Sequence, residues 1–203
     1  TDLQQIAEIA IENDIIVMAD EIYKDMYYGD QEHVSITKFP GMRDRTVILD
    51  GFSKSYAMTG WRLGYGVFPD FLVEPVVRLM TNSVSCTSVF SQMAAVAALE
   101  GPQDSVRMMM EEFTKRRDLV VQGLNSLPDI TCPEPKGAFY AFPNIRSTGL
   151  SSEEFAEKAM YDAGVALLAG TAFGRYGDGY VRISFANSQK NLREAIERLR
   201  QIL

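Results

Sequence analysis

The sequence has few residues of the kinds that bind metals or form disulfides. It contains two cysteines, Cys86 and Cys132, and a single histidine, His33. The cysteines have neither metal-ligand nor CxxC spacing, so we expect free thiols, a reducing compartment and no metal site. His33 has no obvious partner for a Ser/His/Asp or Cys/His arrangement, and we interpret it as a solvated loop residue.

An excess of positive charge and long apolar runs are also lacking. The formal net charge is −7, which argues against non-specific binding to nucleic acid or to anionic membranes. No run of about eighteen apolar residues and no charged-then-apolar leader is found, so we expect a cytoplasmic protein without membrane segments. The hydrophobic content of 46% is ordinary for a globular chain, and 203 residues suffice for one large or two small domains.

The most informative stretch is residues 51–64, with the sequence GFSKSYAMTGWRLG. It follows an apolar run, residues 46–49, that is typical of a buried strand. Lys54 lies there between serines, and Arg62 lies in a glycine-flanked turn. A lone loop lysine is usually just solvated, but open α/β sheets bind their ligands directly after strands. The combination of Ser53, Lys54 and Arg62 therefore indicates a site for a cofactor that carries an aldehyde and a phosphate.

Over its whole length this stretch resembles the pyridoxal-phosphate attachment signature of the class I/II (fold-type-I) aminotransferases. The resemblance implies that Lys54 holds pyridoxal 5'-phosphate as an internal Schiff base and that Ser53 and Arg62 bind the phosphate. The chemistry agrees, because a guanidinium offers a planar fork for bidentate phosphate binding. A lysine with the ordinary pKa of ~10.4 must be desolvated or lie beside positive charge to act as an amine.

A second motif, Asp-Glu-Ile-Tyr at residues 20–23, follows the apolar run 15–19. We expect that run to be a strand buried on both faces of a parallel sheet. Spacing alone leaves Asp20 either a turn residue or a ligand group. By the resemblance, Asp20 pairs with the pyridine nitrogen of the cofactor and keeps it protonated, Tyr23 donates a hydrogen bond to its phenolic oxygen, and Glu21 has a structural role.

Arg182 lies within an apolar strand pattern, residues 180–185. A buried guanidinium needs an anionic partner. The sequence by itself leaves open a structural ion pair or a ligand, whereas the resemblance implies that Arg182 binds the α-carboxylate of the substrate. Ala169 stands where the family usually has a proline before Gly170.

Periodicity predicts an α/β chain. Helices are expected at residues 2–13, 69–80, 88–100, 103–126 and 151–164 and after Ser188, and further strands at 63–67, 137–142 and 165–168. Residues 88–100 are expected to bury one apolar side, which includes Val89, Met93 and Leu99. Ser151 to Glu154 forms a capping-box pattern. By the resemblance, residues 1–114 are part of a large cofactor-binding domain with a mostly parallel sheet, and residues 115–203 form a small α+β C-terminal domain.

The resemblance spans nearly the whole chain but only the C-terminal half of a typical family member. We therefore expect a truncated chain that can be inactive by itself. The implied function is an aminotransferase acting on an amino acid and a 2-oxo acid, as a homodimer in the complete protein. Two alternatives share the same cofactor residues: a C-S β-lyase, and the ligand-sensing domain of a MocR-like transcription regulator.

Overall fold

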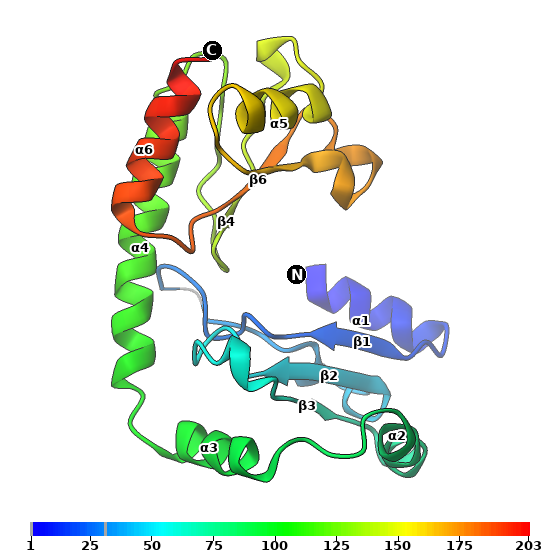
Figure 1. The fold of residues 1–203 in the computed structure, drawn as a ribbon. Coiled ribbons are helices and arrows are strands. Elements are labelled where there is room, and N and C mark those ends of the chain that lie inside the picture. The colour runs from blue at the N-terminus through cyan, green and yellow to red at the C-terminus, as the bar shows by residue number, and fades with distance from the viewer. Residues whose placement is uncertain (1, 31) are drawn as a thin grey trace. The chain divides into compact units, whose positions relative to one another are not determined.

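The computed structural model describes residues 2–30 and 32–203, which form two compact units that divide between Val106 and Arg107 (Figure 1). The division falls inside helix α4 (Asp104–Asn125), the helix in which the sequence analysis put the boundary between residues 1–114 and 115–203. Within the described residues, no helix combines the length and the apolar character that a membrane span requires. The units are described one at a time.

Unit 1 is built around a three-stranded sheet with the order β1-β2-β3. Its helices and strands are α1 (Asp2–Glu12), β1 (Val17–Asp20), β2 (Thr46–Gly51), β3 (Gly64–Val67), α2 (Asp70–Ser83) and α3 (Val89–Glu100). Strands β1 and β2 are parallel, whereas β3 runs antiparallel to β2. The carboxyl ends of β1 and β2 and the beginning of β3 therefore meet at one edge of a mixed sheet.

Two apolar clusters hold this unit together. In the first, α1 packs against β1 and a following 3₁₀ turn through Ala7, Ala10, Ile36 and Met42, all buried. The alanines on one side of α1 let the helix approach β1 closely. Figure 1 shows α1 lying next to β1. The second cluster lies under the stretch that carries Lys54 and fixes it against α3.

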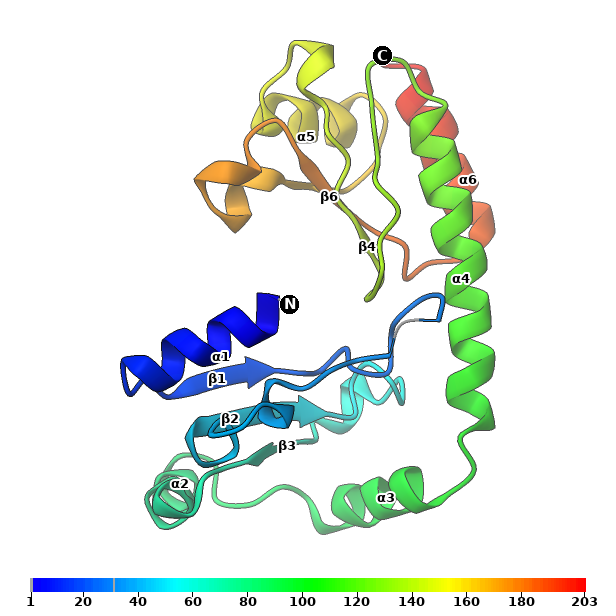
Figure 2. The same cartoon turned by 180° about the vertical axis from the view of Figure 1, so that it is seen from behind.

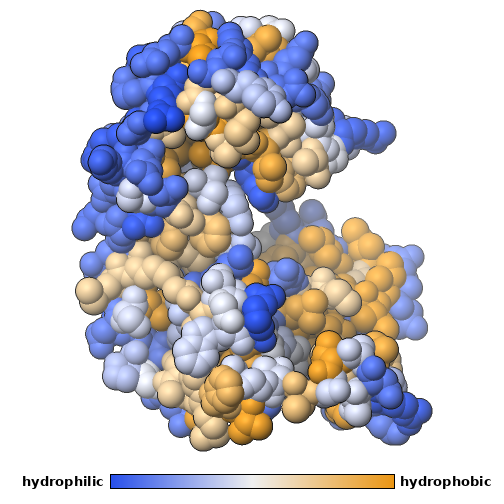
Figure 3. All heavy atoms as spheres, viewed as in Figure 1, coloured by the Kyte–Doolittle hydropathy of each residue, from blue (hydrophilic) through white to orange (hydrophobic). Residues whose placement is uncertain are grey.

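The expectation that β1 is buried on both faces was wrong. The side chains of β1 alternate between half-buried and exposed, and Met18 is 70% exposed. Helix α3 also differs from expectation, because Val89, Met93 and Leu99 lie exposed while Ser91 and Ala95 are buried. Figure 3 shows apolar side chains gathered on the surface of the part of unit 1 that contains α1 and β1. Sequence periodicity identified the apolar residues of β1 and α3, but it does not show which face of a strand or helix packs against another element.

Unit 2 combines a helix pair with a small antiparallel sheet of order β4-β6-β5. Its further elements are β4 (Tyr140–Ala141), α5 (Ser152–Tyr161), β5 (Leu168–Ala169), β6 (Val181–Ser184) and α6 (Gln189–Arg200). Helices α4 and α6 lie side by side in both Figure 1 and Figure 2. Gly123 permits this close packing, since a Cβ at that position would overlap the Ile196 side chain. Stacked Phe113 and Phe139 rings, 5.6 Å apart, join α4 to the sheet region.

Helix α5 begins at the capping box predicted from the sequence. The Ser151 side chain accepts a hydrogen bond from the Glu154 N–H, and the Glu154 carboxylate accepts one from the Ser151 N–H. Both interactions satisfy N–H groups that a helix start leaves without intrahelical partners. The strand expected at 137–142 is shorter than predicted, because only Tyr140 and Ala141 pair with β6.

Candidate active site

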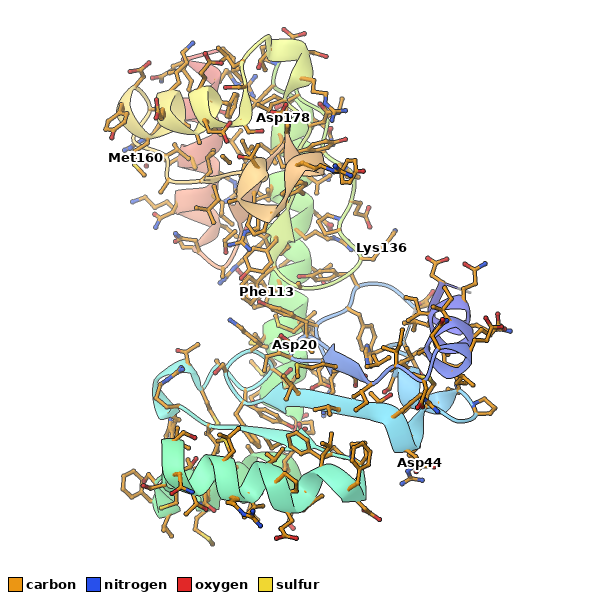
Figure 4. All side chains as sticks on the ribbon, turned by 90° about the vertical axis from the view of Figure 1, so that its right-hand side faces the viewer. Asp20, Asp44, Phe113, Lys136, Met160 and Asp178 are labelled. Carbon is orange, nitrogen blue, oxygen red and sulfur yellow. The ribbon has the colours of Figure 1, made fainter. Side chains whose placement is uncertain are left out.

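Five of the six residues singled out from the sequence lie in unit 1, and they follow or precede strand ends at one sheet edge. Asp20 is the last residue of β1, where Figure 4 labels it, and the β1–β2 register pairs it with Leu49. Because β1 and β2 are parallel, the segment after Asp20 and the segment after Gly51 emerge at the same edge. Arg62 precedes β3, whose first residue pairs with Gly51. The topology therefore brings three separate sequence segments together.

The loop between β2 and β3 is closed by its own backbone. Phe52 donates its N–H to the Leu63 carbonyl at 3.3 Å, and Met58 donates to the Phe52 carbonyl at 3.1 Å. Gly51 faces Gly64, and a Cβ on Gly51 would lie 3.0 Å from the Gly64 Cα. A side chain at Gly51 would therefore force apart the two strands at the point where the loop begins.

Two non-glycine residues of this loop adopt left-handed backbone conformations, Ala57 with φ 53° and Arg62 with φ 52°. Such conformations cost on the order of 1–3 kcal/mol each and persist only where surrounding contacts impose them. Buried Phe52 and Leu63 supply those contacts by packing with Ala95 of α3. These contacts therefore hold the loop in the conformation that carries Lys54.

The Lys54 side chain is half-buried and extends over the ring of Tyr23. Its Nζ lies 5.7 Å from the ring centroid, within the range of a cation–π contact. Tyr23 belongs to the turn after β1 and Lys54 to the loop after β2, so two segments that are remote in sequence meet at these side chains. The contact joins the two motifs that the sequence analysis had identified separately.

Arg62 and Ser53 belong to the same loop as Lys54. The Arg62 guanidinium donates to the Thr59 carbonyl at 2.8 Å, and within the described residues no carboxylate pairs with it. Ser53 is half-buried. A guanidinium and a hydroxyl beside a lysine form a donor set that fits a phosphate-bearing aldehyde. The residues present therefore fit pyridoxal phosphate.

The turn after β1 is held by side chains near Asp20. Asp20 Oδ1 accepts the Ile22 N–H at 3.2 Å, and the Asp20 side chain is exposed. His33 Nε2 lies 3.1 Å from Glu21 Oε2, whose side chain is 10% exposed. His33 is an exposed loop residue, as expected, and it also contacts Glu21. Glu21 has the structural contact expected of it, because it joins this turn to the loop that contains His33.

A buried carboxylate that the sequence analysis did not identify lies behind the loop. The Asp50 side chain is 5% exposed, and its Oδ2 lies 2.5 Å from Lys24 Nζ and 2.5 Å from the Tyr65 hydroxyl. Lys24 and Tyr65 are also within hydrogen-bond distance of each other, at 3.1 Å. In the sequence, Asp50 stands directly before Gly51, and an Asp-Gly pair is typical of a turn. Nothing in the sequence indicates Lys24 and Tyr65 as its partners, so only the fold reveals them.

Arg182 lies on β6 in unit 2, between two aromatic rings. Its guanidinium carbon is 4.4 Å from the Tyr140 ring centroid and 4.4 Å from that of Phe173. No carboxylate of the described chain forms an ion pair with it. Of the two readings that the sequence left open, an internal ion pair is therefore not found. Stacking on aromatic faces leaves the N–H edge of a guanidinium available for a planar anion.

Comparison with known proteins identifies the family. The family model described as "Aminotransferase class I and II" matches residues 1–199. The chain is 43% identical to an aspartate aminotransferase of Pyrococcus abyssi and 43% identical to aromatic-amino-acid aminotransferase 2 of Thermococcus litoralis. Each alignment covers 100% of this chain and 52% of the relative. The chain thus spans about half the length of the curated relatives that it matches.

Solved structures show the same similarity. An aromatic aminotransferase from Pyrococcus horikoshii matches with a TM-score of 0.96 and 43% identity, over 99% of this chain and 54% of that one. The fold is that of a part of a fold-type-I pyridoxal-phosphate protein. The chain belongs to the class I and II aminotransferase family, whose members depend on pyridoxal phosphate.

Proposed function

We propose that this chain is the catalytic half of an aminotransferase, with pyridoxal phosphate attached to Lys54. The observation that carries the proposal is the meeting of Lys54 with Tyr23 at the sheet edge where Asp20 and Arg62 also lie. The matched relatives are named as aminotransferases of aspartate and of aromatic amino acids, which supports the same reaction. By this proposal the substrates are an amino acid and a 2-oxo acid.

Each residue has a distinct task in the proposed reaction. Ser53 and Arg62 hold the cofactor phosphate through a hydroxyl and a guanidinium. Asp20 pairs with the ring nitrogen, and Tyr23 donates its hydroxyl to the phenolic oxygen. Lys54 Nζ attaches the cofactor and, once released by the substrate, removes the proton from the substrate α-carbon and carries it.

The cofactor, when bound, supplies the electron sink that makes this proton removable. Proton transfer by a positioned side chain contributes about 10²- to 10⁴-fold to such a rate. Because the protein has to supply binding, orientation and that proton carrier, a loop of fixed shape around Lys54 suits the task. The left-handed residues Ala57 and Arg62 provide such a loop.

Arg182 binds the α-carboxylate of the substrate in this proposal. Its guanidinium is held between Tyr140 and Phe173 and has no carboxylate partner among the described side chains. A bidentate guanidinium–carboxylate pair is strong and directional, so it orients the substrate as well as binding it. We also propose a homodimer for the complete protein, while a cytoplasmic location stays a prediction from the sequence.

The test begins with the covalent link. The purified 203-residue chain is mixed with pyridoxal phosphate, reduced with borohydride, digested and mapped by mass spectrometry. We expect the label on Lys54, its loss in Lys54→Arg, and its retention in Lys38→Arg, which alters an exposed lysine of the same unit. Label spread over surface lysines with none on Lys54 would contradict the proposal.

The reaction class is tested next, with the loaded chain and a panel that includes aspartate, tyrosine and cysteine. Transamination converts the bound cofactor to its amine form and yields a 2-oxo acid without ammonia. Release of ammonia together with a 2-oxo acid from cysteine would instead indicate the C-S lyase. If the amino acids bind but neither product forms, the result favours a ligand-binding domain, as in the transcription-regulator alternative.

A further inference from the structure

We propose that Asp50 is a positioning residue that fixes the Lys54 loop against its two neighbouring segments. The ordering of the Lys54 loop by Asp50 can be measured on the chain without cofactor. The effect of Asp50 on cofactor attachment rests on the proposed function above.

The geometry at Asp50 uses both carboxylate oxygens. Oδ1 accepts the Gly51 N–H at 2.7 Å, which sets the orientation of the carboxylate. Oδ2 accepts from Lys24 Nζ and from the Tyr65 hydroxyl, each at 2.5 Å. Since the Asp50 side chain is only 5% exposed, water does not replace these partners readily. A buried carboxylate with three donors is a satisfied group, and losing its charge would leave donors unpaired.

The partners of Asp50 adjoin residues of the candidate site. Lys24 directly follows Tyr23, and Tyr65 lies on β3 shortly after Arg62. Asp50 itself lies at the end of β2, where the loop begins. The carboxylate therefore connects the turn after β1, the start of the loop and the strand at which the loop ends.

Electrostatics keep the two donors of the network protonated. Burial lowers the pKa of Lys24, but its hydrogen bonds to Asp50 and Tyr65 outweigh burial and raise that pKa above its ordinary value. Burial and the bond to Asp50 raise the pKa of Tyr65 as well. Near neutral pH both groups therefore keep their protons and both donate to the carboxylate.

The network is also packed against the loop. The Tyr65 ring lies 5.8 Å from the Phe52 ring, and Phe52 is 3% exposed in the cluster that fixes the loop to α3. A change at Asp50 therefore reaches Phe52 through one intervening side chain. An exposed ion pair on the surface has no such packing contact with a buried side chain, and it contributes little to stability.

Asp50→Asn tests the proposal while keeping the side-chain shape. Asparagine cannot accept from Gly51 N–H and from the Lys24 and Tyr65 donors at once, because one of its two atoms is itself a donor. We expect about tenfold faster amide exchange, measured by mass spectrometry without cofactor, in peptides covering residues 21–26 and 51–65. Peptides from α1 and α2 should be unchanged. Asp14→Asn, which removes an exposed carboxylate paired with Arg45, is the matched control.

Two outcomes of the exchange experiment would overturn the proposal: unchanged exchange in the loop, or acceleration spread evenly over unit 1, as general destabilisation would give. If Asp50→Asn does not fold, Tyr65→Phe removes one donor, keeps the carboxylate, and should give a smaller increase confined to the same peptides.

Labelling of Lys54 with pyridoxal phosphate is a second experiment, and it distinguishes a failure of this inference from a failure of the proposed function. If wild type is labelled at Lys54, Asp50→Asn should need about tenfold more pyridoxal phosphate for equal labelling, and Asp14→Asn should not. Equal labelling of wild type and Asp50→Asn would overturn the positioning role toward the cofactor. If wild type is not labelled at all, the proposed function fails, and the exchange result alone decides whether Asp50 orders the loop.

Discussion

Arg62 and Arg182 are two arginines to which the described chain supplies no carboxylate partner. Charged side chains that are partly buried normally find such partners, because desolvation of a charge is costly. By contrast, Arg117 is buried and pairs with Asp118 and Glu134. Arg182 is half-buried between two aromatic rings and lacks such a partner, which favours the proposal that it binds an anionic ligand, whereas Arg62 is exposed and needs no partner.

We predict that Arg182→Gln weakens the response to amino acids but leaves cofactor attachment intact. A charge-assisted hydrogen bond contributes about 1.5–3 kcal/mol, so the amino-acid concentration for half-maximal response should rise about 10- to 100-fold. The absorbance of the loaded chain during an amino-acid titration measures this. Arg193→Gln, on helix α6, is the matched control. An unchanged midpoint for Arg182→Gln would refute the assignment.

The two cysteines should differ strongly in reactivity. Both are free, as expected from the sequence, but Cys86 is exposed and Cys132 is buried. Burial raises the pKa of Cys132 to about 11. At neutral pH its thiolate fraction is about a hundredfold below that of an ordinary thiol. Iodoacetamide followed by peptide mass spectrometry should label Cys86 first; equal rates would contradict the burial of Cys132.

At the scale of elements, the loop after β2 derives its shape from its neighbours. Its left-handed residues, Ala57 and Arg62, carry a conformational cost that local sequence does not offset. Phe52 and Leu63 packing on α3 offsets it. Helix α5 is the opposite case, because Ser151 and Glu154 specify its start locally.

Ser151→Ala should loosen the first turn of α5. Loss of an N-cap side chain costs about 1 kcal/mol, so amide exchange in the peptide from Ser152 to Phe155 should rise about fivefold. Exchange in α6 should not change. Ser147→Ala, at an exposed position of a neighbouring turn, is the matched control. If both variants behave alike, the capping box contributes nothing measurable.

The same helix start should depend on pH. Bonds from the Ser151 N–H, and then from its hydroxyl, lower the pKa of Glu154 below 4.5. A carboxyl with a lowered folded-state pKa stabilises the fold above its unfolded pKa, and this stability is lost as pH falls through the folded value. Protection of the first α5 amides, corrected for intrinsic exchange, should therefore fall below about pH 4.5 in wild type. In Glu154→Gln it should fall less.

For the molecule as a whole, each unit has its own core, but unit 1 leaves much apolar surface uncovered. Met18 on β1, Val67 on β3 and Phe90 on α3 are 70%, 54% and 76% exposed. Helix α3 is apolar on nearly all sides, which is typical of a helix that is covered in an assembly. Contiguous apolar patches on soluble proteins usually mark a surface that binds another chain.

We therefore predict that the 203-residue chain self-associates. Sedimentation velocity over a range of concentrations should show species larger than 22.7 kDa. The double variant Phe90→Ser and Met93→Ser, which replaces two exposed residues of α3, should shift the distribution toward monomer without unfolding the chain. A wild-type chain that stays monomeric at every concentration would contradict this prediction.

Several features were determined by the sequence alone. Helix positions followed from apolar periodicity, the α5 start from its capping residues, and the family from the motifs at residues 20–23 and 51–64. These are local signals, since spacing and side-chain chemistry along a short segment suffice to specify them. The roles of all six site residues, Asp20, Tyr23, Ser53, Lys54, Arg62 and Arg182, stay predictions.

Only the tertiary structure decided which residues meet. Strand pairing placed Lys54 over Tyr23 and buried Asp50 with Lys24 and Tyr65, although no local pattern linked those segments. The fold also leaves Met18 exposed to solvent, although the apolar run that contains Met18 had indicated a buried strand. Burial and side-chain partners depend on contacts between segments far apart in the chain. The sequence therefore predicted the cofactor lysine, and the fold revealed the partners of Asp50 beside its loop.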